Sequence, residues 1–424
     1  MNNISFEEKV KANAYALERI KSSDPYLVDV RTVEEVVPNF KKNMILTSGA
    51  PLPWEEYTGG QRNAILSGAL FEGLAENLED AESKITSGEI TIAPCHDFGC
   101  IGSVTGIYTA SMPVFVVEDR TNGNRAFCSP YEGAIEEKIT YGLYTDNTRN
   151  NLLHLKEVVC NVIGIAVRES GGIALRPIIR RAINMGDELH SRNTAASLLF
   201  SRHLFPYLLE QYNTDPVAIN QTLDYLNNDY NFLRLAMAAC KVTSDTISNI
   251  KGCSIVTAMT FSCKEFAIRV SGLGDQWFRA PLPKGQVKLF EGYTDADVSW
   301  MGGESCITET MGLGGFVQAA AFTLQDYSGG TPELMIENNN KMYEITLDEH
   351  PEYKIPVFQF RGAPLGIDIH RIVESGITPV INMGVAHKDG GQIGAGVVSA
   401  PTICFEKATK AYNKVYIRSI ANAP

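Results

Sequence analysis

The sequence predicts an α+β fold of several domains, in which mixed sheets flank a central helical domain. Three observations support this class. The chain has 424 residues, enough for two or three domains. Strand-like segments occur in the first and last thirds, whereas successive helical patterns with few β-branched runs fill the middle. We therefore expect an N-terminal α/β domain at residues 1–146, a helical domain at 147–251 and a C-terminal α+β domain at 252–424.

The first domain is expected to begin with a helix over residues 6–20, because its apolar residues have helical spacing and Ser5 is a suitable N-cap. A longer amphipathic helix is expected over residues 54–78. The other elements are strands, predicted at residues 26–30, 90–93, 114–118 and 126–128, the last two on either side of the hairpin signal Asn122-Gly123-Asn124.

The middle and last domains are predicted from the same periodicities. In the middle domain the patterns predict helices, at residues 152–169, 173–185, 194–211, 216–227 and 232–248. In the last domain they predict strands at residues 255–261, 265–270, 355–360, 379–385 and 393–398, and helices at 306–325, 332–343 and 402–415.

Composition excludes several classes of protein. The net charge of -12 and the pI of about 5.2 argue against nonspecific binding to nucleic acid or to a membrane surface, both of which favour a basic protein. The nine cysteines are scattered and odd in number, which indicates reduced thiols in a cytosol and not a disulfide framework. We find no signal-peptide pattern at the N-terminus and no apolar run of about 20 residues, so we expect a cytoplasmic protein without a membrane span.

The first candidate site is the segment 185–193. It concentrates charged and amide side chains between two apolar runs, where buried polar groups need partners or a ligand. The alternative is a helix boundary, with the first acid as N-cap and the other side chains in solvent. The candidate residues are Asp187, Glu188, His190, Arg192 and Asn193.

The segment 94–103 follows a predicted strand. Cys95, His96 and Cys100 are types of residue that bind metals, and Cys95 is also a candidate nucleophile. The spacing does not match a standard zinc module, so we expect no metal. A loop that binds an anion through the amides around Ser103 fits better. A tight turn with buried thiols remains the simplest structural alternative.

Three later segments complete the candidates. Arg269 ends a strand before a glycine-containing loop and is suited to bind a carboxylate or phosphate, although a turn pinned by aromatic residues is the alternative. In the glycine-rich segment 302–316, helical spacing places Ser305 on one face with Thr308 or with Glu309. The last segment runs from a buried strand into charged residues, and its candidates are Asn382, His387 and Lys388.

Together these segments resemble the YlbE/YahG-type bacterial family over nearly the whole chain. The family has been linked to a subunit of oxamate carbamoyltransferase in allantoin breakdown. The motifs that carry the resemblance are Pro94-Cys95-His96 with Cys100 and Gly102-Ser103, residues 185–193, Arg269 to Leu273 with Gln276-Trp277-Phe278, and residues 304–316 and 377–388.

The resemblance implies a multi-subunit enzyme that moves a carbamoyl group between oxamate and phosphate without a redox cofactor. Its small anionic substrates would be oxamate or oxalurate and carbamoyl phosphate or phosphate, and its partners would be other subunits and further copies of this chain. Such chemistry must bind two anions, stabilise an oxyanion and move a proton. Two alternatives stay open: a non-catalytic assembly or ligand-binding subunit, and a metal-dependent amidohydrolase-like enzyme.

We assign the candidate residues to these tasks. His190, His387 and Glu309 are candidates for moving the proton. The candidates for binding substrate are Cys95, His96, Ser103, Asp187, Glu188, Arg192, Asn193, Arg269, Ser305, Thr308, Asn382 and Lys388. Because loops from distant segments often line one site, we expect all of these segments to meet in a single cleft.

Overall fold

The computed structural model describes residues 4–133, 137–299 and 302–417 and has the predicted α+β fold, with several separate sheets. The helices are α1 (Phe6–Ser22), α2 (Val33–Val36), α3 (Gly59–Phe71), α4 (Leu78–Ser87), α5 (Asp146–His154), α6 (Cys160–Glu169), α7 (Leu175–Asn184), α8 (Thr194–Tyr212), α9 (Pro216–Leu226), α10 (Asn231–Asp245), α11 (Ile307–Thr310), α12 (Gln325–Ser328), α13 (Pro332–Ile345), α14 (Ile369–Ser375) and α15 (Thr402–Tyr416).

The strands form one parallel pair and several antiparallel sheets. They are β1 (Pro25–Thr32), β2 (Met44–Thr47), β3 (Thr91–Pro94), β4 (Pro113–Asp119), β5 (Arg125–Cys128), β6 (Ile173–Ala174), β7 (Val256–Phe261), β8 (Glu265–Val270), β9 (Phe278–Pro281), β10 (Gln286–Leu289), β11 (Val298–Ser299), β12 (Thr346–Ile355), β13 (Arg361–Ile367), β14 (Val380–His387) and β15 (Gln392–Ser399).

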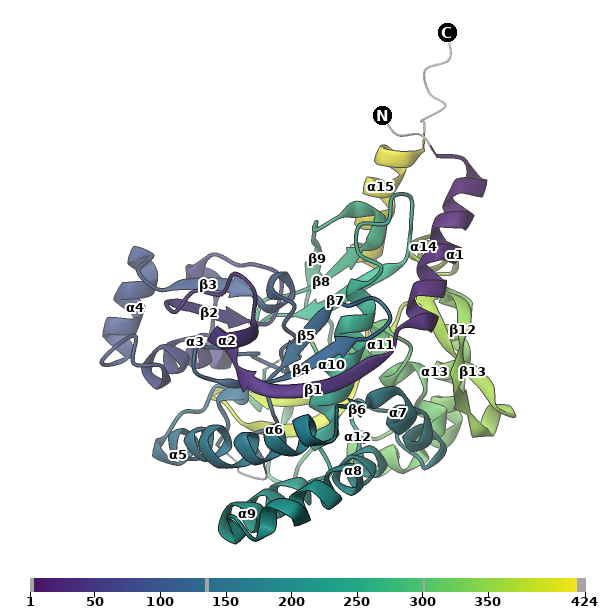
Figure 1. The fold of residues 1–424 in the computed structure, drawn as a ribbon. Helices are drawn as coiled ribbons and strands as arrows, with labels where there is room; N and C mark the ends of the chain where they lie inside the picture. Colours follow the sequence, from purple (N-terminus) through teal and green to yellow (C-terminus); the bar gives the residue numbers. More distant parts are fainter. Residues whose placement is uncertain (1–3, 134–136, 300–301, 418–424) are drawn as a thin grey trace.

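Helix α1 begins as the sequence predicts. Ser5 accepts a hydrogen bond from the amide of Glu8, whose carboxylate accepts one from the amide of Ser5, so the two residues form a capping box. The amide of Ile4 donates to the carbonyl of Tyr416 at 3.0 Å, which joins the start of α1 to the end of α15. The start of α1 and the end of α15 therefore lie side by side at one end of the molecule (Figure 1).

The buried helix α10 is the centre of the fold. It packs against β4 and β5 of the sheet β5-β4-β1-β6, against α7 and α8 of the helical region, and against α11 and β7 of the C-terminal region (Figure 1). Helix α6 packs against β1 of the same sheet. The largest hydrophobic core runs from Ala16 to Leu365, so residues of all three regions contribute to it. Side chains on α10 can therefore reach loops from every part of the chain.

The C-terminal region contains three sheets. Strand β14 pairs antiparallel with β15 from Val380↔Ser399 to Ala386↔Gln392, in the four-stranded sheet β10-β15-β14-β11. The sheet β7-β8-β9 is covered by α15, and the hairpin β12-β13 lies beside α13. The short helix α11 packs against α10 and β7, which brings the glycine-rich segment to the centre of the molecule.

Three predicted elements differ in the structure. The helix expected over residues 54–78 is a 3-10 turn, the helix α3 and a break before α4, because the chain leaves α3 at Gly73 with φ 72°. The helix expected over 306–325 consists of α11 followed by 3-10 turns, since Gly312 and Gly314 have φ values of 81° and 56°. The strand expected over 355–360 is wrong because Pro356 opens a 3-10 turn where β12 ends.

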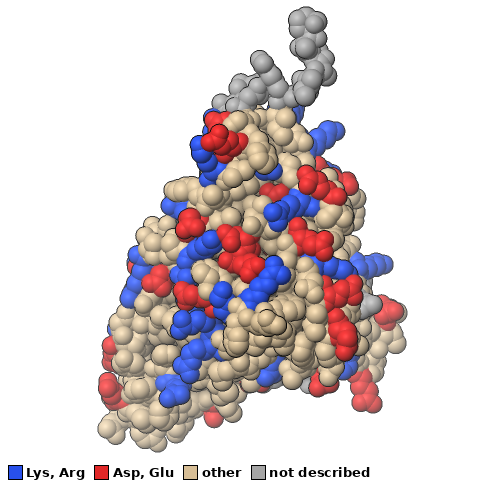
Figure 2. All heavy atoms as spheres, turned by 90° about the vertical axis from the view of Figure 1, so that its right-hand side faces the viewer, with Lys and Arg blue, Asp and Glu red and all other residues tan. Residues whose placement is uncertain are grey.

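Charged side chains of both signs lie on the surface, as the many acidic and basic residues of the sequence predict. On the face drawn in Figure 2, basic and acidic side chains are interspersed and no large patch of one sign is visible. Among the residues that the structure describes, no helix is both long enough and apolar enough to cross a membrane.

Candidate functional site

His190 contacts both Ser305 and Glu309 at the centre of the molecule. Its Nε2 atom lies 2.9 Å from Ser305 Oγ, and its Nδ1 atom lies 2.8 Å from Glu309 Oε1. His190 comes from the loop between α7 and α8, whereas the other two side chains come from α11 and the turn before it. Their spacing of four residues lets both reach one imidazole ring. A hydroxyl, an imidazole and a carboxylate in this order form the arrangement that activates a serine in many acyl-transfer enzymes.

The surroundings of Glu309 determine which imidazole nitrogen carries the proton. The Oε1 atom accepts hydrogen bonds from the amides of Gly315 at 2.9 Å and Asn382 at 3.1 Å, and Oε2 accepts one from the Thr308 hydroxyl at 2.8 Å. A carboxylate in this position is an acceptor only, so His190 Nδ1 must donate to it. In the neutral ring the lone pair of Nε2 then faces Ser305, whose hydroxyl is the donor of that bond.

Two opposing effects act on the pKa of His190. Burial lowers the pKa, because the imidazolium loses its hydration. The charge and hydrogen bond of Glu309, together with the charge of Glu188, raise it by more, so the pKa lies above its ordinary value of 6.5. The site therefore stabilises the imidazolium that forms when His190 takes a proton from Ser305.

The polar residues around His190 hold its loop in place. The carboxylate of Glu188 is fully buried and accepts hydrogen bonds from the amides of His190 at 3.0 Å and Arg192 at 2.7 Å, and burial raises its pKa to about 7. Asp187 accepts the amide of Ala196 in the first turn of α8 at 2.8 Å, and burial raises its pKa as well. The helix-boundary alternative is therefore wrong in expecting Glu188 in solvent, whereas Asp187 does accept an amide at the start of a helix, as that alternative expects.

The rest of the cluster also supports the loop. The Arg192 Nε atom donates to the carbonyl of Gly186 at 3.0 Å and lies 3.4 Å from Asp187 Oδ1. The Asn193 side chain donates to the carbonyl of His190 at 3.0 Å. These contacts hold the loop that carries His190. Neither Arg192 nor Asn193 lines either of the two cavities described below.

A cavity of about 70 Å³ lies against Ser305 and His190. Among the described residues that line it there is no Asp or Glu, whereas Lys138 and Arg234 both face it, so the cavity favours an anion. Its other lining residues are Ser103, Val104, Tyr131, Thr140, Tyr141, Ser191, Tyr230, Leu233, Gly302, Tyr327, Gly384 and Gln392.

Arg234 is the functional candidate that the sequence analysis missed. Its side chain projects from α10 and is only 3% exposed. Among the described residues its guanidinium donates only to Ser129 Oγ, at 3.3 Å, and its Nε atom has no hydrogen-bond partner. Burying a charge without a counter-ion is costly, so such an arginine is typical of a site that binds an anion. The signal in the sequence is a single arginine within the apolar run 232–240.

Lys138 is the second missed cation. Its Nζ atom lies 3.1 Å from the Tyr131 hydroxyl and 5.0 Å from the centre of that ring. Tyr131 packs against Tyr230, and Tyr230 against Tyr327, so aromatic rings form one wall of the cavity. This wall excludes water from one side of any anion held between the two cations.

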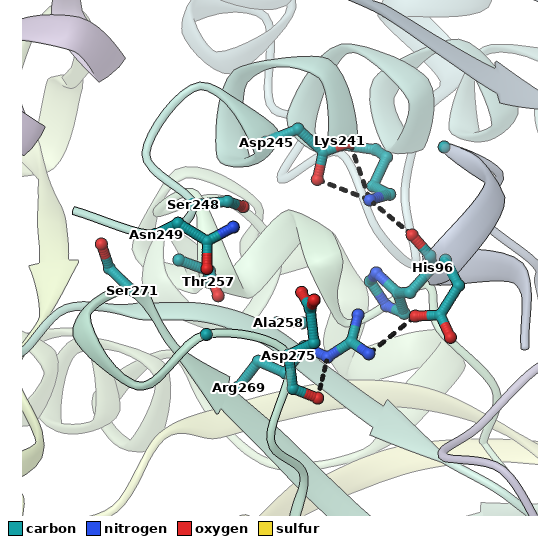
Figure 3. Close-up of a pocket in the computed structure, with 13 residues that line it drawn as sticks. His96, Lys241, Asp245, Ser248, Asn249, Thr257, Ala258, Arg269, Ser271 and Asp275 are labelled. Carbon is teal, nitrogen blue, oxygen red and sulfur yellow. Dashed lines mark hydrogen bonds and ion pairs between the residues drawn. The ribbon is translucent and has the colours of Figure 1, made fainter. Parts of the chain in front are cut away.

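A larger cavity of about 340 Å³ contains other predicted residues (Figure 3). Arg269 lines it, but its Nη2 atom pairs with Asp97 Oδ1 at 2.6 Å and its Nε atom donates to the carbonyl of Asp275 at 3.2 Å. The guanidinium also lies 4.2 Å from the centre of the Trp277 ring. Arg269 would have to leave Asp97 to bind substrate, so the geometry favours the alternative of a turn pinned by an ion pair and an aromatic ring.

Lys241 and Asp245, which also line this larger cavity, are paired with each other. Lys241 donates to both carboxylate oxygens of Asp245, at 2.5 and 2.7 Å, and to the carbonyl of His96 at 3.3 Å (Figure 3). Burial lowers the pKa of His96 well below its ordinary value, and its Nε2 atom has no hydrogen-bond partner within the described chain. His96 is therefore neutral near pH 7 and held by packing.

Glu304 lies next to residues that line each of the two cavities, His96 and Ser305. Its carboxylate accepts hydrogen bonds from the amides of Gly49 at 3.1 Å and Gly102 at 2.7 Å, and one oxygen lies 3.8 Å from His96 Nε2. Burial raises its pKa to about 8. Because Ser305 follows Glu304 directly, this carboxyl connects the wall of the larger cavity to the residue that contacts His190.

Cys95 does not reach either cavity. Its thiol is fully buried and donates to the carbonyl of Gly106 at 3.2 Å, and burial raises its pKa well above the ordinary value. A thiol in this state is a poor nucleophile. Within residues 4–133, 137–299 and 302–417 there is no group of three His, Cys, Asp or Glu side chains arranged to hold a metal ion.

His387 and Lys388 lie at the end of β14 and do not line either cavity. Lys388 Nζ pairs with Asp297 Oδ1 at 3.1 Å. The His387 ring packs against the Tyr293 ring, with 5.8 Å between the ring centres. The backbone amide of Asn382, earlier in the same strand, donates a hydrogen bond to Glu309 Oε1.

The predicted segments thus divide between two cavities. The structure groups one set around the smaller cavity: Ser103, His190, Ser305, Thr308, Glu309 and Asn382. The segment 269–278 lines only the larger cavity, and 94–103 contributes to both. The expectation of a single cleft is therefore wrong, because the segments 185–193 and 269–278 line different cavities.

Comparison with known proteins gives a consistent result. A family model described as "Oxamate carbamoyltransferase subunit AllG" matches residues 90–305. The chain is 39% identical over 412 residues to the oxamate carbamoyltransferase subunit AllG of Escherichia coli strain K12, covering 96% of this chain and 98% of that one. It is 38% identical over 401 residues to the uncharacterized protein YahG of the same strain, covering 94% and 84%. A crystal structure of a conserved protein of unknown function from Enterococcus faecalis V583 matches with a TM-score of 0.94 at 35% identity, covering 98% of this chain and 100% of that chain.

Proposed function

Because this chain belongs to the AllG family of oxamate carbamoyltransferase subunits, we propose that it carries the transfer chemistry of such an enzyme. The reaction moves a carbamoyl group between oxalurate and phosphate, with oxamate and carbamoyl phosphate on the other side, in the breakdown of purine nitrogen. The observation that carries the proposal is the contact of His190 with Ser305 and Glu309 beside a cavity that two cations line.

The cations match the substrates. Oxamate and oxalurate each carry a carboxylate, and phosphate is an anion as well. Arg234 offers a planar fork of donors and Lys138 a compact charge, and both face the cavity. In this proposal the anion that binds supplies the counter-ion that the buried guanidinium lacks.

His190 suits the proton transfers. Breaking the bond between the carbamoyl carbon and the oxamate nitrogen requires a proton on the departing nitrogen, since an amide anion is a poor leaving group. The neutral ring can accept a proton at Nε2 while Glu309 steadies the Nδ1 side. No redox cofactor is needed for this exchange of one carbonyl substituent for another.

The enzyme is proposed to act as an assembly. The family is named for a subunit, so we propose that this chain works with other subunits and also with further copies of itself. The competing proposal, a non-catalytic assembly or ligand-binding subunit, requires that the contacts of His190 serve stability alone. An experiment on the assembled enzyme separates the two.

We would reconstitute the chain with the remaining subunits and measure phosphate-dependent cleavage of oxalurate. His190→Ala should lower kcat by about 10²- to 10⁴-fold, the usual contribution of a group that transfers a proton. His203→Ala is the matched control, because His203 lies on the exposed side of α8. An assembled complex of His190→Ala that keeps the wild-type rate would assign the chemistry to another subunit.

A further inference from the structure

We propose that the transfer proceeds in two steps through a carbamoyl group carried on Ser305 Oγ. This inference rests on the proposed function, because it specifies how the same site passes the carbamoyl group on. It differs from direct transfer, in which phosphate attacks oxalurate while both are bound.

The first argument is the direction of the hydrogen bond between Ser305 and His190. A serine that only binds an anion donates its proton to that anion. In the neutral form of His190 the hydroxyl donates to Nε2, because Nδ1 already donates to Glu309. The lone pairs of Oγ are therefore free for an electrophilic carbon, and the base is at hydrogen-bond distance, as nucleophilic catalysis requires.

The second argument is the charge of the cavity. Among the described residues that line it, the Lys and Arg side chains are a single pair, Lys138 and Arg234. Direct transfer must hold the carboxylate of oxalurate and the phosphate at the same time. A two-step transfer needs only one anion at a time, because oxamate leaves before phosphate enters. The same two cations then serve both substrates in turn.

The first step forms one bond and breaks one. Ser305 Oγ attacks the terminal ureido carbonyl of oxalurate, and its proton passes to His190 Nε2. The bond from that carbon to the inner nitrogen, which also carries the oxalyl group, breaks. His190 gives the proton to this nitrogen as oxamate leaves. The enzyme then holds a carbamoyl ester on Ser305 and a neutral His190.

The second step reverses these roles. An oxygen of hydrogen phosphate attacks the carbamoyl carbon and passes its proton to His190. The bond between the carbon and Ser305 Oγ breaks, and His190 returns the proton to Oγ. The products are carbamoyl phosphate and the original enzyme, so atoms and charges balance over the cycle.

Isotope exchange on the assembled enzyme tests the order of events. With carbamoyl phosphate and labelled phosphate but no oxamate, a two-step enzyme moves label into carbamoyl phosphate, whereas direct transfer gives no exchange. Labelled oxamate should likewise enter oxalurate without phosphate. Ser305→Ala should lower both exchanges and net transfer by about 10⁴-fold or more. Ser305→Cys, which keeps a nucleophile, should retain part of the exchange.

A covalent probe tests the nucleophile separately. 4-Nitrophenyl carbamate delivers the same carbamoyl group, so the full chain, alone or assembled, should gain one carbamoyl mass on the peptide that contains Ser305. His190→Ala should slow this labelling. Ser375→Ala is the matched control, because Ser375 is an exposed serine on α14 that lines neither cavity.

The outcomes are distinguishable. Exchange and labelling that both depend on Ser305 establish the inference. Net transfer without exchange and without labelling overturns it and leaves the proposed function intact. Labelling at Ser305 without any transfer of oxalurate supports the nucleophile and overturns the oxamate substrate. Neither transfer nor labelling, in a complex that assembles, overturns both.

Discussion

At the scale of single residues, the site depends on buried ionisable groups that serve different tasks. Glu309 is surrounded by donors and orients His190. Glu188 and Glu304 bond to backbone amides and shape loops. Arg234 is buried and lacks a carboxylate partner among the described residues. Buried charges with complete hydrogen bonding contribute to structure, whereas a buried guanidinium beside a cavity without a counter-ion is typical of a site that binds an anion.

Arg234→Met should weaken anion binding without weakening the fold. Losing a charge-assisted bond to phosphate costs about 1.5–3 kcal/mol, so the affinity for phosphate should fall by about 10- to 100-fold. The Tm should stay constant or rise, because a charge without a buried counter-ion is removed. Calorimetric titration and thermal melting on the same samples measure both. A lower Tm with unchanged affinity would mean that Arg234 is structural.

Glu304→Gln should change how stability depends on pH. The pKa of Glu304 is about 8 in the folded chain and 4.5 is its ordinary value, so the folded state keeps a proton that the unfolded state loses between these values. Its contribution is fully present below pH 4.5 and is lost as the pH rises to about 8, at about 1.4 kcal/mol for each unit of pKa difference. The variant should therefore lose less Tm over this range than the wild type.

Glu344→Gln serves as the control for that series, because Glu344 lies exposed on α13 and its substitution should leave the curve unchanged. Parallel curves for wild type and Glu304→Gln would contradict a buried carboxyl that titrates near pH 8.

At the scale of elements, the glycine-rich turn after α11 gives the site its shape. Gly314 has φ 56°, and a Cβ atom there would lie 2.2 Å from Glu309 Oε1. A Cβ on Gly315 would lie 2.0 Å from the carbonyl of Val380. These glycines let the chain fold back onto the carboxylate and let β14 approach it. The same feature ends the helix that the sequence periodicity predicts over residues 306–325.

Gly314→Ala should impair catalysis more than folding. The methyl group displaces the Glu309 carboxylate from His190 Nδ1, so kcat should fall by at least about tenfold. Because Glu309 raises the pKa of His190, the acidic limb of the kcat–pH profile should also shift to lower pH. Gly376→Ala is the matched control: Gly376 also has positive φ, 72°, but no atom lies within 4 Å of its Cβ position. Both variants should share a backbone cost of about 1–2 kcal/mol. Equal kcat in the two would contradict the steric role.

Sequence periodicity predicted the elements better than the contacts between them. The helices of the middle region and the strands β7, β8, β14 and β15 follow from apolar spacing. The spacing of Ser305 and Glu309 also placed both on one face. The partner of this pair, His190, lies more than a hundred positions away, and no local rule connects them. Arg234 is a single arginine among apolar residues whose periodicity predicts a core helix, so this periodicity does not indicate an anion site.

At the scale of the whole molecule, the smaller cavity is built by residues from Ser103 to Gln392. They come from all three regions of the chain and meet around α10, which packs against each of them. A site built in this way forms only when the whole chain is folded. Binding at the cavity should therefore stabilise the molecule as one unit.

Phosphate should accordingly raise the Tm of a single, cooperative unfolding transition. At a concentration of about 100 times Kd, the stabilisation is about 2.7 kcal/mol for one site. Differential scanning calorimetry on the wild type and on Arg234→Met measures the shift, which should be reduced in the variant. Several transitions, of which phosphate moves only one, would show that the three regions unfold independently.

Burial of Ser305 and His190, which are 6% and 5% exposed, bears on how faithfully the carbamoyl group reaches its acceptor. An ester on an exposed serine would be divided between phosphate and water, and the share taken by water would decay to ammonia and carbon dioxide. Restricting the approach of solvent to one side of the ester shifts this kinetic partition toward phosphate. The yield of carbamoyl phosphate for each oxalurate consumed should then stay close to one, even when phosphate is scarce.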